Sequence, residues 1–326
     1  MGNFEFGNSK MKFNQPVHKW NFVSRFGTDV TADGYYTSVR GLAVDSSGNL
    51  YAADSRLNKI IKFDSSGNFI ANYSSSRLLV PHKIAVDNSG NIYIADNSLE
   101  KVFKFNSSFE YILEFGGYGT NDWQFNHIYG IAVDSSGNVY AVDYGSKSIK
   151  KFNSSGEYIT KWGTTGSGDG QFDQPTGIAV DSSGNVYVTD EGSNDRIQKF
   201  NSSGEYITKW GTTGGGYGQF NNPRSIAIDS YGNVYVAENN GVRIQKFTTA
   251  DGITYTYNSK VSSTGASTLP SYNYTAIVGF TDLFEIACDS DGSLVYTAEG
   301  SFANFRIMQF NGSLAYQKTF GYWKRN

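Results

Sequence analysis

Six positions in the chain carry side chains that could hold a ligand together. Each stands five residues before a recurring Asp, and they are Arg40, His82, Tyr129, Thr176, Arg224 and Phe284. A guanidinium group can grip a carboxylate through two parallel hydrogen bonds, and imidazole and phenol groups add further polar contacts. If the fold gathers these residues, they form a candidate site for a small acidic ligand or a peptide. The alternative is that they only fill the space where they meet.

The elements that carry these residues are short β-strands. Between Pro175 and Gly211 the sequence has four runs rich in Val, Ile, Tyr, Phe and Thr, separated by segments of Gly, Asn, Asp and Ser. Such runs favour strands, and the segments between them favour tight turns. In DSSGN, the Asp181 side chain can bond to the backbone two residues on, and Gly184 tolerates a left-handed conformation. The passage therefore predicts a four-stranded antiparallel meander.

This passage recurs along the chain. The Asp that ends the first run appears at Asp45, Asp87, Asp134, Asp181, Asp229 and Asp289, at intervals of about 42 to 48 residues and a last interval of about 60. Six such sheets arranged radially bury both faces of each sheet and leave only short edges. The prediction is an all-β fold, a six-bladed β-propeller of four-stranded antiparallel blades.

The repeats resemble NHL repeats, a family of propeller units. The shared features are GIAVD, GNVYV followed by Thr or Ala and Asp, an Arg or Lys before Ile, and a loop with GQF and a following Pro. The resemblance covers residues 39–321 and implies the propeller fold. We expect a single domain over residues 1–326, in which residues 1–38 supply an additional strand that closes or covers an edge. A fold of this kind hosts many activities, so function must come from the site.

Enzymes of similar fold suggest an alternative function. Propeller lyases that resemble this scaffold hold zinc with histidines near the channel, but this chain has only His18, His82 and His127. Lactonases of related fold bind calcium through carboxylate and Asn ligands, and the six positions contain no acid, although Glu285 is adjacent. We therefore predict a non-catalytic binding propeller with no metal or cofactor. The alternative is a metal-dependent lyase or lactonase that acts at the central channel.

Composition excludes several classes of partner. The chain has 27 Lys and Arg against 30 Asp and Glu, a formal net charge of −3, so nucleic acid is an unlikely partner. The sequence has no run of about 18 apolar residues, so it predicts no membrane-spanning helix. The single cysteine, Cys288, replaces a Val of the repeat and is expected to be a buried apolar residue. Abundant Ser, Asn, Gly and Tyr favour an extracellular or cell-surface protein, and we expect a monomer.

The loops divide into two kinds, and this division locates the predicted site. First-to-second and third-to-fourth turns are uniform, as in DSSGN and NSSGE, whereas second-to-third loops differ in every repeat. In an antiparallel meander these two sets lie on opposite faces of the ring. The varied face, where the six residues enter the innermost strands, is therefore the predicted recognition face for a protein, peptide or glycan.

An acid and a base also recur inside each repeat. The acids that end the second strand are Asp54, Asp96, Asp143, Asp190, Glu238 and Glu299, and the bases that open the third are Lys59, Lys101, Arg196, Arg243 and Arg306. The third repeat has Ser148 at the base position with Lys147 beside it. We predict ion pairs within each blade rather than metal sites.

The two ends of the chain compete for one place. Residues 314–320 and residues 20–26 both have the pattern of a fourth strand. Because residues 314–320 follow the third strand through a tight turn, their pairing has little loop-closure cost. We predict that they complete the last blade and that residues 20–26 add outside them or cover that edge.

Overall fold

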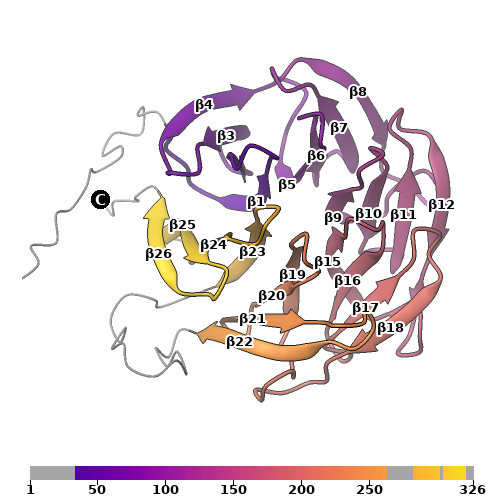
Figure 1. The fold of residues 1–326 in the computed structure, drawn as a ribbon. Coiled ribbons are helices and arrows are strands. Elements are labelled where there is room, and N and C mark those ends of the chain that lie inside the picture. The colour runs from indigo at the N-terminus through magenta and orange to yellow at the C-terminus, as the bar shows by residue number, and fades with distance from the viewer. Residues whose placement is uncertain (1–33, 263–281, 302–303, 321–326) are drawn as a thin grey trace, which may run out of the picture.

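The computed structural model describes residues 34–262, 282–301 and 304–320, and they form six four-stranded antiparallel sheets. The sheets stand in a ring, with the first blade beside the sixth, as Figure 1 shows. The predicted six-bladed β-propeller is confirmed. None of the described residues forms a helix long and apolar enough to cross a membrane.

The first strand of each blade faces the central channel, because these strands contact one another around the ring. They are β1 (Val39–Val44), β5 (Pro81–Val86), β9 (Ile128–Val133), β15 (Gln174–Val180), β19 (Pro223–Ile228) and β23 (Leu283–Cys288). The second strands are β2 (Leu50–Asp54), β6 (Ile92–Asp96), β10 (Val139–Asp143), β16 (Val186–Glu191), β20 (Val234–Glu238) and β24 (Leu294–Ser301).

The outer half of each blade consists of its third and fourth strands. The third strands are β3 (Lys59–Phe63), β7 (Lys101–Phe105), β11 (Ser148–Phe152), β17 (Arg196–Phe200), β21 (Arg243–Thr248) and β25 (Asn304–Asn311). The fourth strands are β4 (Phe69–Ser74), β8 (Tyr111–Gly116), β12 (Tyr158–Trp162), β18 (Tyr206–Trp210), β22 (Thr256–Ser262) and β26 (Tyr316–Phe320). A short parallel pair, β13 (Thr164–Thr165) and β14 (Gln171–Phe172), lies in the loop before the fourth blade.

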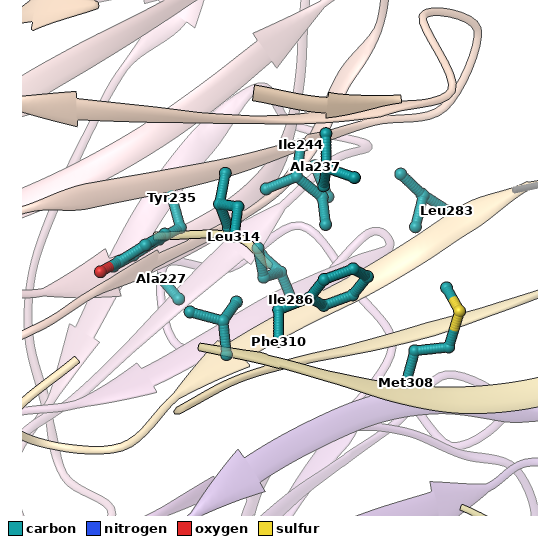
Figure 2. Packing of buried hydrophobic residues seen from close by; sticks show 11 residues of the cluster. Ala227, Tyr235, Ala237, Ile244, Leu283, Ile286, Met308, Phe310 and Leu314 are labelled. Carbon is teal, nitrogen blue, oxygen red and sulfur yellow. The ribbon is translucent and has the colours of Figure 1, made fainter. Parts of the chain in front are cut away.

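The core lies between blades rather than within one. Second strands are buried on both faces, and each contributes one fully buried Tyr, from Tyr51 to Tyr296. Figure 2 shows the junction of the fifth and sixth blades, where Tyr235 and Ile244 pack against Ile286 and Phe310. Burial of such side chains contributes roughly 1.5–3 kcal/mol each, so each blade depends on both neighbours.

A belt of polar side chains links the blades on the face of the uniform turns. In four junctions the ammonium group of a third-strand lysine donates to a carbonyl oxygen in the third-to-fourth turn of the next blade. The four are Lys104 to Ser154 at 2.9 Å, Lys151 to Ser202 at 2.9 Å, Lys199 to Gly252 at 2.7 Å and Lys246 to Gly312 at 2.8 Å. In the sixth blade Gln309 occupies this position and donates to the Ser65 carbonyl of the first blade at 3.2 Å. The uniform turns are therefore part of the scaffold.

The recurring acids hold the loops of the varied face. Asp190 accepts hydrogen bonds from the backbone N–H of Asp173 and Gln174, and it pairs with Arg196 at 3.1 Å. The remaining N–H groups of Arg196 donate to three carbonyl oxygens of the loop before the fourth blade, those of Ser167, Gly168 and Gln171. Arg243 makes the same arrangement in the fifth blade, with Glu238 at 2.6 Å.

The third blade keeps this ion pair with a base from a different position. Lys150 lies 2.9 Å from Asp143 and donates to the Gln124 carbonyl, while Ser148 occupies the usual base position. Residues two apart on a strand share a face, so Lys150 reaches the same acid that Arg196 reaches in the fourth blade. The sequence pointed to Lys147, which instead lies over the Tyr144 ring at 3.9 Å. In the second blade the base does not pair with the predicted acid, Asp96: Lys101 pairs instead with Glu114 at 2.6 Å.

The C-terminal strand completes the ring as predicted. β26 pairs with β25 and occupies the fourth position of the sixth blade. Tyr36 connects the sixth blade to the first. Its ring is buried between the two blades, and its hydroxyl oxygen accepts a hydrogen bond from the Ile307 N–H at 3.0 Å. Residues 20–26, and with them the predicted edge strand, lie outside the described residues.

Candidate functional site

The ring of innermost strands brings the six predicted residues to one end of the channel. Each is the second residue of its strand, except Thr176, which is the third residue of β15. Five of the six side chains are half-buried, and Thr176 is buried. We call Arg40, His82, Tyr129, Thr176, Arg224 and Phe284 the channel ring.

Five members of the channel ring contact one another in sequence around the opening. The Arg40 guanidinium lies 4.0 Å above the Phe284 ring, and the Arg224 guanidinium lies 5.6 Å from the same ring. Arg224 reaches past the fourth blade and donates a hydrogen bond to the Tyr129 hydroxyl. The rings of Tyr129 and His82 are 5.2 Å apart. The opening is therefore bordered by a continuous arc of cationic and aromatic groups.

Thr176 is the exception in the ring. Its hydroxyl lies 2.9 Å from the Thr189 hydroxyl and donates to Glu191 at 3.1 Å. The short side chain leaves the space through which Arg224 reaches Tyr129. Thr176 therefore shapes the opening rather than lining it with a group available to a ligand.

The Arg224 guanidinium lies close enough to Arg40 to affect its pKa. The pKa of Arg40 is lowered by burial and, next, by the positive charge of Arg224, while Tyr129 and Asp282 oppose the shift. Within the described part of the chain, no carboxylate oxygen lies within 4.0 Å of the Arg224 guanidinium. Partly buried like charges favour an anion between them, because it would offset both.

His82 is neutral in this setting. Burial holds the pKa of His82 well below the ordinary value, and the nearby charges of Lys83, Arg40 and Arg224 lower it further. Its Nδ1 atom is buried and makes no hydrogen bond with the described residues. A buried polar atom without a partner is uncommon and marks a place where a ligand or water would be stabilised.

A buried polar layer lies one residue further along the same strands. Lys83 of the second blade forms an ion pair with Glu285 of the sixth blade, and Glu285 accepts a hydrogen bond from Ser225 at 2.7 Å. The blade between them has Gly41 at this level, where an added Cβ would lie 2.8 Å from the His82 carbonyl oxygen, so glycine permits the close approach of β1 to β5. Sequence reasoning had marked Glu285 as a possible calcium ligand, and the structure shows that Lys83 and Ser225 engage its carboxylate.

Two further residues at the opening were missed from the sequence. Glu191 and Tyr144 each stand one residue after the acid that ends a second strand, a position that varies from blade to blade. Glu191 is buried beside Thr176, and burial raises its pKa, although Arg224 opposes the shift. The Tyr144 ring lies 5.9 Å from the Tyr129 ring. The variability of this position within the chain was the signal that could have identified them.

A cavity of about 340 Å³ lies at the other end of the channel. Each blade contributes to it one apolar residue, the recurring Asp and the next small polar residue, as in Val44, Asp45 and Ser46. The Asp45 carboxylate is used in its own turn, where it accepts hydrogen bonds from the N–H groups of Ser47 and Asn49 at 3.0 and 2.9 Å. Cys288 lines this cavity, and burial raises the pKa of its thiol.

The donor set for a metal-dependent enzyme is not assembled in the described residues. No group of three His, Cys, Asp or Glu side chains among them could hold a metal ion. The Nδ1 atom of His127 lies 3.2 Å from a Glu100 carboxylate oxygen, and His18 lies outside the described residues. The described His, Cys, Asp and Glu side chains therefore do not fit a zinc centre.

Known proteins share the repeat and the fold of this chain. The family model described as NHL repeat matches residues 172–200 and 220–247, in the fourth and fifth blades. No curated protein matches the chain.

Several solved structures resemble it at low sequence identity. A streptogramin B lyase structure has 16% identity and a TM-score of 0.59, covering 89% of this chain and 85% of that chain. A selenomethionine-substituted virginiamycin B lyase from Staphylococcus aureus has 15% identity and a TM-score of 0.57, covering 89% and 86%. A chain of a nidogen/laminin complex has 18% identity and a TM-score of 0.55, covering 69% and 80%. At such identities the likeness concerns the fold. With the NHL match inside two of six equivalent blades that close into one ring, this chain belongs to the NHL-repeat β-propellers.

Proposed function

We propose that this propeller is a non-catalytic recognition module that binds an acidic ligand, carried by a protein, peptide or glycan, at the channel ring. The observation that carries the proposal is the pair of guanidinium groups, Arg40 and Arg224, that share the Phe284 ring at the channel opening. Arg224 has a phenol as its hydrogen-bond partner, so its charge remains available to an anion. A chain of a nidogen/laminin complex has a similar fold, which supports a role in protein binding. An extracellular or cell-surface setting belongs to the same proposal.

Removal of the two arginines tests the proposal. The double variant Arg40→Ala/Arg224→Ala is compared with Arg77→Ala, because Arg77 also stacks on an aromatic ring, that of Tyr111 at 4.0 Å, but on the outer strands. Both proteins are screened against arrays of peptides and glycans, with circular dichroism to establish that they fold. We expect the double variant to lose acidic ligands that the wild type and Arg77→Ala retain. If the double variant and the control bind alike, the channel ring is not the site.

The alternative function is a metal-dependent lyase or lactonase at the channel, and the similarity to two lyase structures supports it at the level of the fold. Metal analysis of the purified full-length chain distinguishes the two functions. A stoichiometric divalent ion that is lost on substitution of His82 would favour the enzyme. Binding of acidic ligands by metal-free protein would favour the recognition module.

A further inference from the structure

The channel ring continues into a second set of side chains over the third blade. The Tyr144 ring lies 5.9 Å from the Tyr129 ring and 5.9 Å from the His127 ring, and all three are half-buried. The Tyr144 hydroxyl donates to the Gln174 side-chain oxygen at 3.3 Å. We call His127, Tyr129 and Tyr144 the aromatic shelf.

The two parts of the opening present different chemistry. On one side, Arg40 and Arg224 supply positive charge around a single phenyl ring. On the other side, the shelf presents aromatic groups whose polar atoms lie at their edges, bordered by the amide of Gln174 and the ammonium group of Lys147. A ligand that fits both sides carries an anionic group at one end and a flat, hydroxyl-rich body at the other.

We propose, on the basis of the recognition function above, that the ligand is an acidic saccharide, a uronate whose carboxylate lies between Arg40 and Arg224 and whose sugar ring stacks on the aromatic shelf. A guanidinium group grips a planar carboxylate with two parallel hydrogen bonds. A pyranose ring has an apolar C–H face for the tyrosine rings and hydroxyls for the amide of Gln174. The groups around the shelf are phenol, imidazole, amide and ammonium, which suit hydroxyls.

An acidic peptide fits the charges, because arginine clusters also bind acidic peptide motifs, but it fits the aromatic shelf less well. Phe284, the apolar ring of the cationic side, has guanidinium groups of Arg40 and Arg224 over it, and the shelf offers polar edges. The peptide is therefore the competing outcome of the test.

Three probes of equal length separate these possibilities: trigalacturonate, neutral galactotriose and triglutamate, each titrated calorimetrically into the full-length protein. We expect trigalacturonate to bind at least about tenfold more tightly than either of the others, which corresponds to about 1.4 kcal/mol. Arg224→Ala should weaken trigalacturonate about tenfold, and Tyr144→Ala should weaken it about fivefold. Tyr144→Phe keeps the ring and should retain most of the affinity. Tyr111→Ala, which removes a half-exposed tyrosine from the outer strand β8, is the matched control and should bind as the wild type does.

The outcomes distinguish this inference from the function on which it rests. Binding of triglutamate as tight as that of trigalacturonate, lost in Arg224→Ala, overturns the saccharide and leaves the recognition of anions intact. Equal binding of galactotriose and trigalacturonate, unaffected by Arg224→Ala, overturns both. Absence of binding by trigalacturonate at millimolar concentration overturns the inference, and the array screen then decides the function. Should Tyr144→Ala fail to fold, the ratio of the three probes on the wild type still decides.

Discussion

Replacing Tyr36 by Phe removes one oxygen atom from the junction between the first and sixth blades. The Tyr36 ring is buried among residues of both blades, and its hydroxyl oxygen accepts the Ile307 N–H at 3.0 Å. Phe preserves the packing of the ring, and Phe occupies the equivalent place before the third, fourth and fifth blades, at Phe125, Phe172 and Phe220. The substitution therefore isolates the hydrogen bond.

The expected loss follows from burial of the donor. Ile307 is fully buried, so its N–H loses a partner without gaining water. Leaving a buried donor unsatisfied costs roughly 1–3 kcal/mol of the free energy of unfolding. For a chain of this size that loss lowers the midpoint of thermal unfolding by roughly 2–6 °C. Arg40 lies in the strand that follows Tyr36 and contacts Phe284 of the sixth blade, so a looser junction should also weaken ligand binding.

Two measurements test this expectation. Differential scanning calorimetry gives the shift of the midpoint, with Tyr231→Phe, a substitution at a residue that is 75% exposed, as the control without effect. Amide hydrogen exchange followed by NMR reports on Ile307 directly, and we expect its protection to fall more than that of Ile244, the equivalent residue of the fifth blade. An unchanged midpoint with unchanged protection at Ile307 would refute the role assigned to the hydroxyl.

Three further predictions concern the scaffold and the ring. Arg196→Met should lower the free energy of unfolding by about 3–5 kcal/mol, because it removes the cation paired with the buried Asp190 and the guanidinium hydrogen bonds to three carbonyls. Lys209→Met, at an exposed pair with Asp169, should have little effect, and urea denaturation compares the two variants. Deletion of residues 1–27 should leave the circular dichroism of the propeller unchanged, since β26 already completes the last blade. Its solubility should fall, because residues 20–26 are predicted to cover the edge of that blade. An unfolded product would contradict this prediction. His82→Asn should reduce the loss of stability on acidification. The pKa of His82 is lowered in the folded protein, so below about pH 6.5 the unfolded chain binds a proton that the folded chain does not, and the wild type becomes less stable as the pH decreases. Equal slopes of melting temperature against pH in the two proteins would count against this prediction.

The strands and their order were predictable because each repeat specifies them locally. The alternation of apolar residues, the Asp and Gly of each turn and the six-fold recurrence place the first strands within one or two residues of where they lie, as for β9 (Ile128–Val133). The gathering of the six ring residues followed from the same topology, since equivalent residues of a ring of blades meet at the same level of the channel. Their part in ligand binding stays a prediction.

Contacts that depend on side-chain reach were not predictable from the repeat. Lys150 replaces the expected base of the third blade because it shares a strand face with Ser148 and is long enough to reach Asp143. Glu191 and Tyr144 join the opening because the second strand ends beside the start of the innermost strand of its own blade, as the contact of Glu191 with Thr176 shows. A prediction that assigns each role to one position of the repeat misses a residue that performs the role from a different position.

The contacts across the channel add a constraint that no single repeat contains. Lys83 reaches Glu285 past the first blade, and Arg224 reaches Tyr129 past the fourth blade. In both cases the residue of the intervening blade at this level is small, Gly41 or Thr176, although glycine at position 41 is also required by the close backbone of β5. Because each contact joins blades that are not neighbours, a change in one blade alters the opening two blades away. In the binding site that we propose, replacement of Thr176 by a larger residue should therefore change the affinity for a ligand as strongly as substitution of Arg224, and calorimetric titration of the two variants tests this.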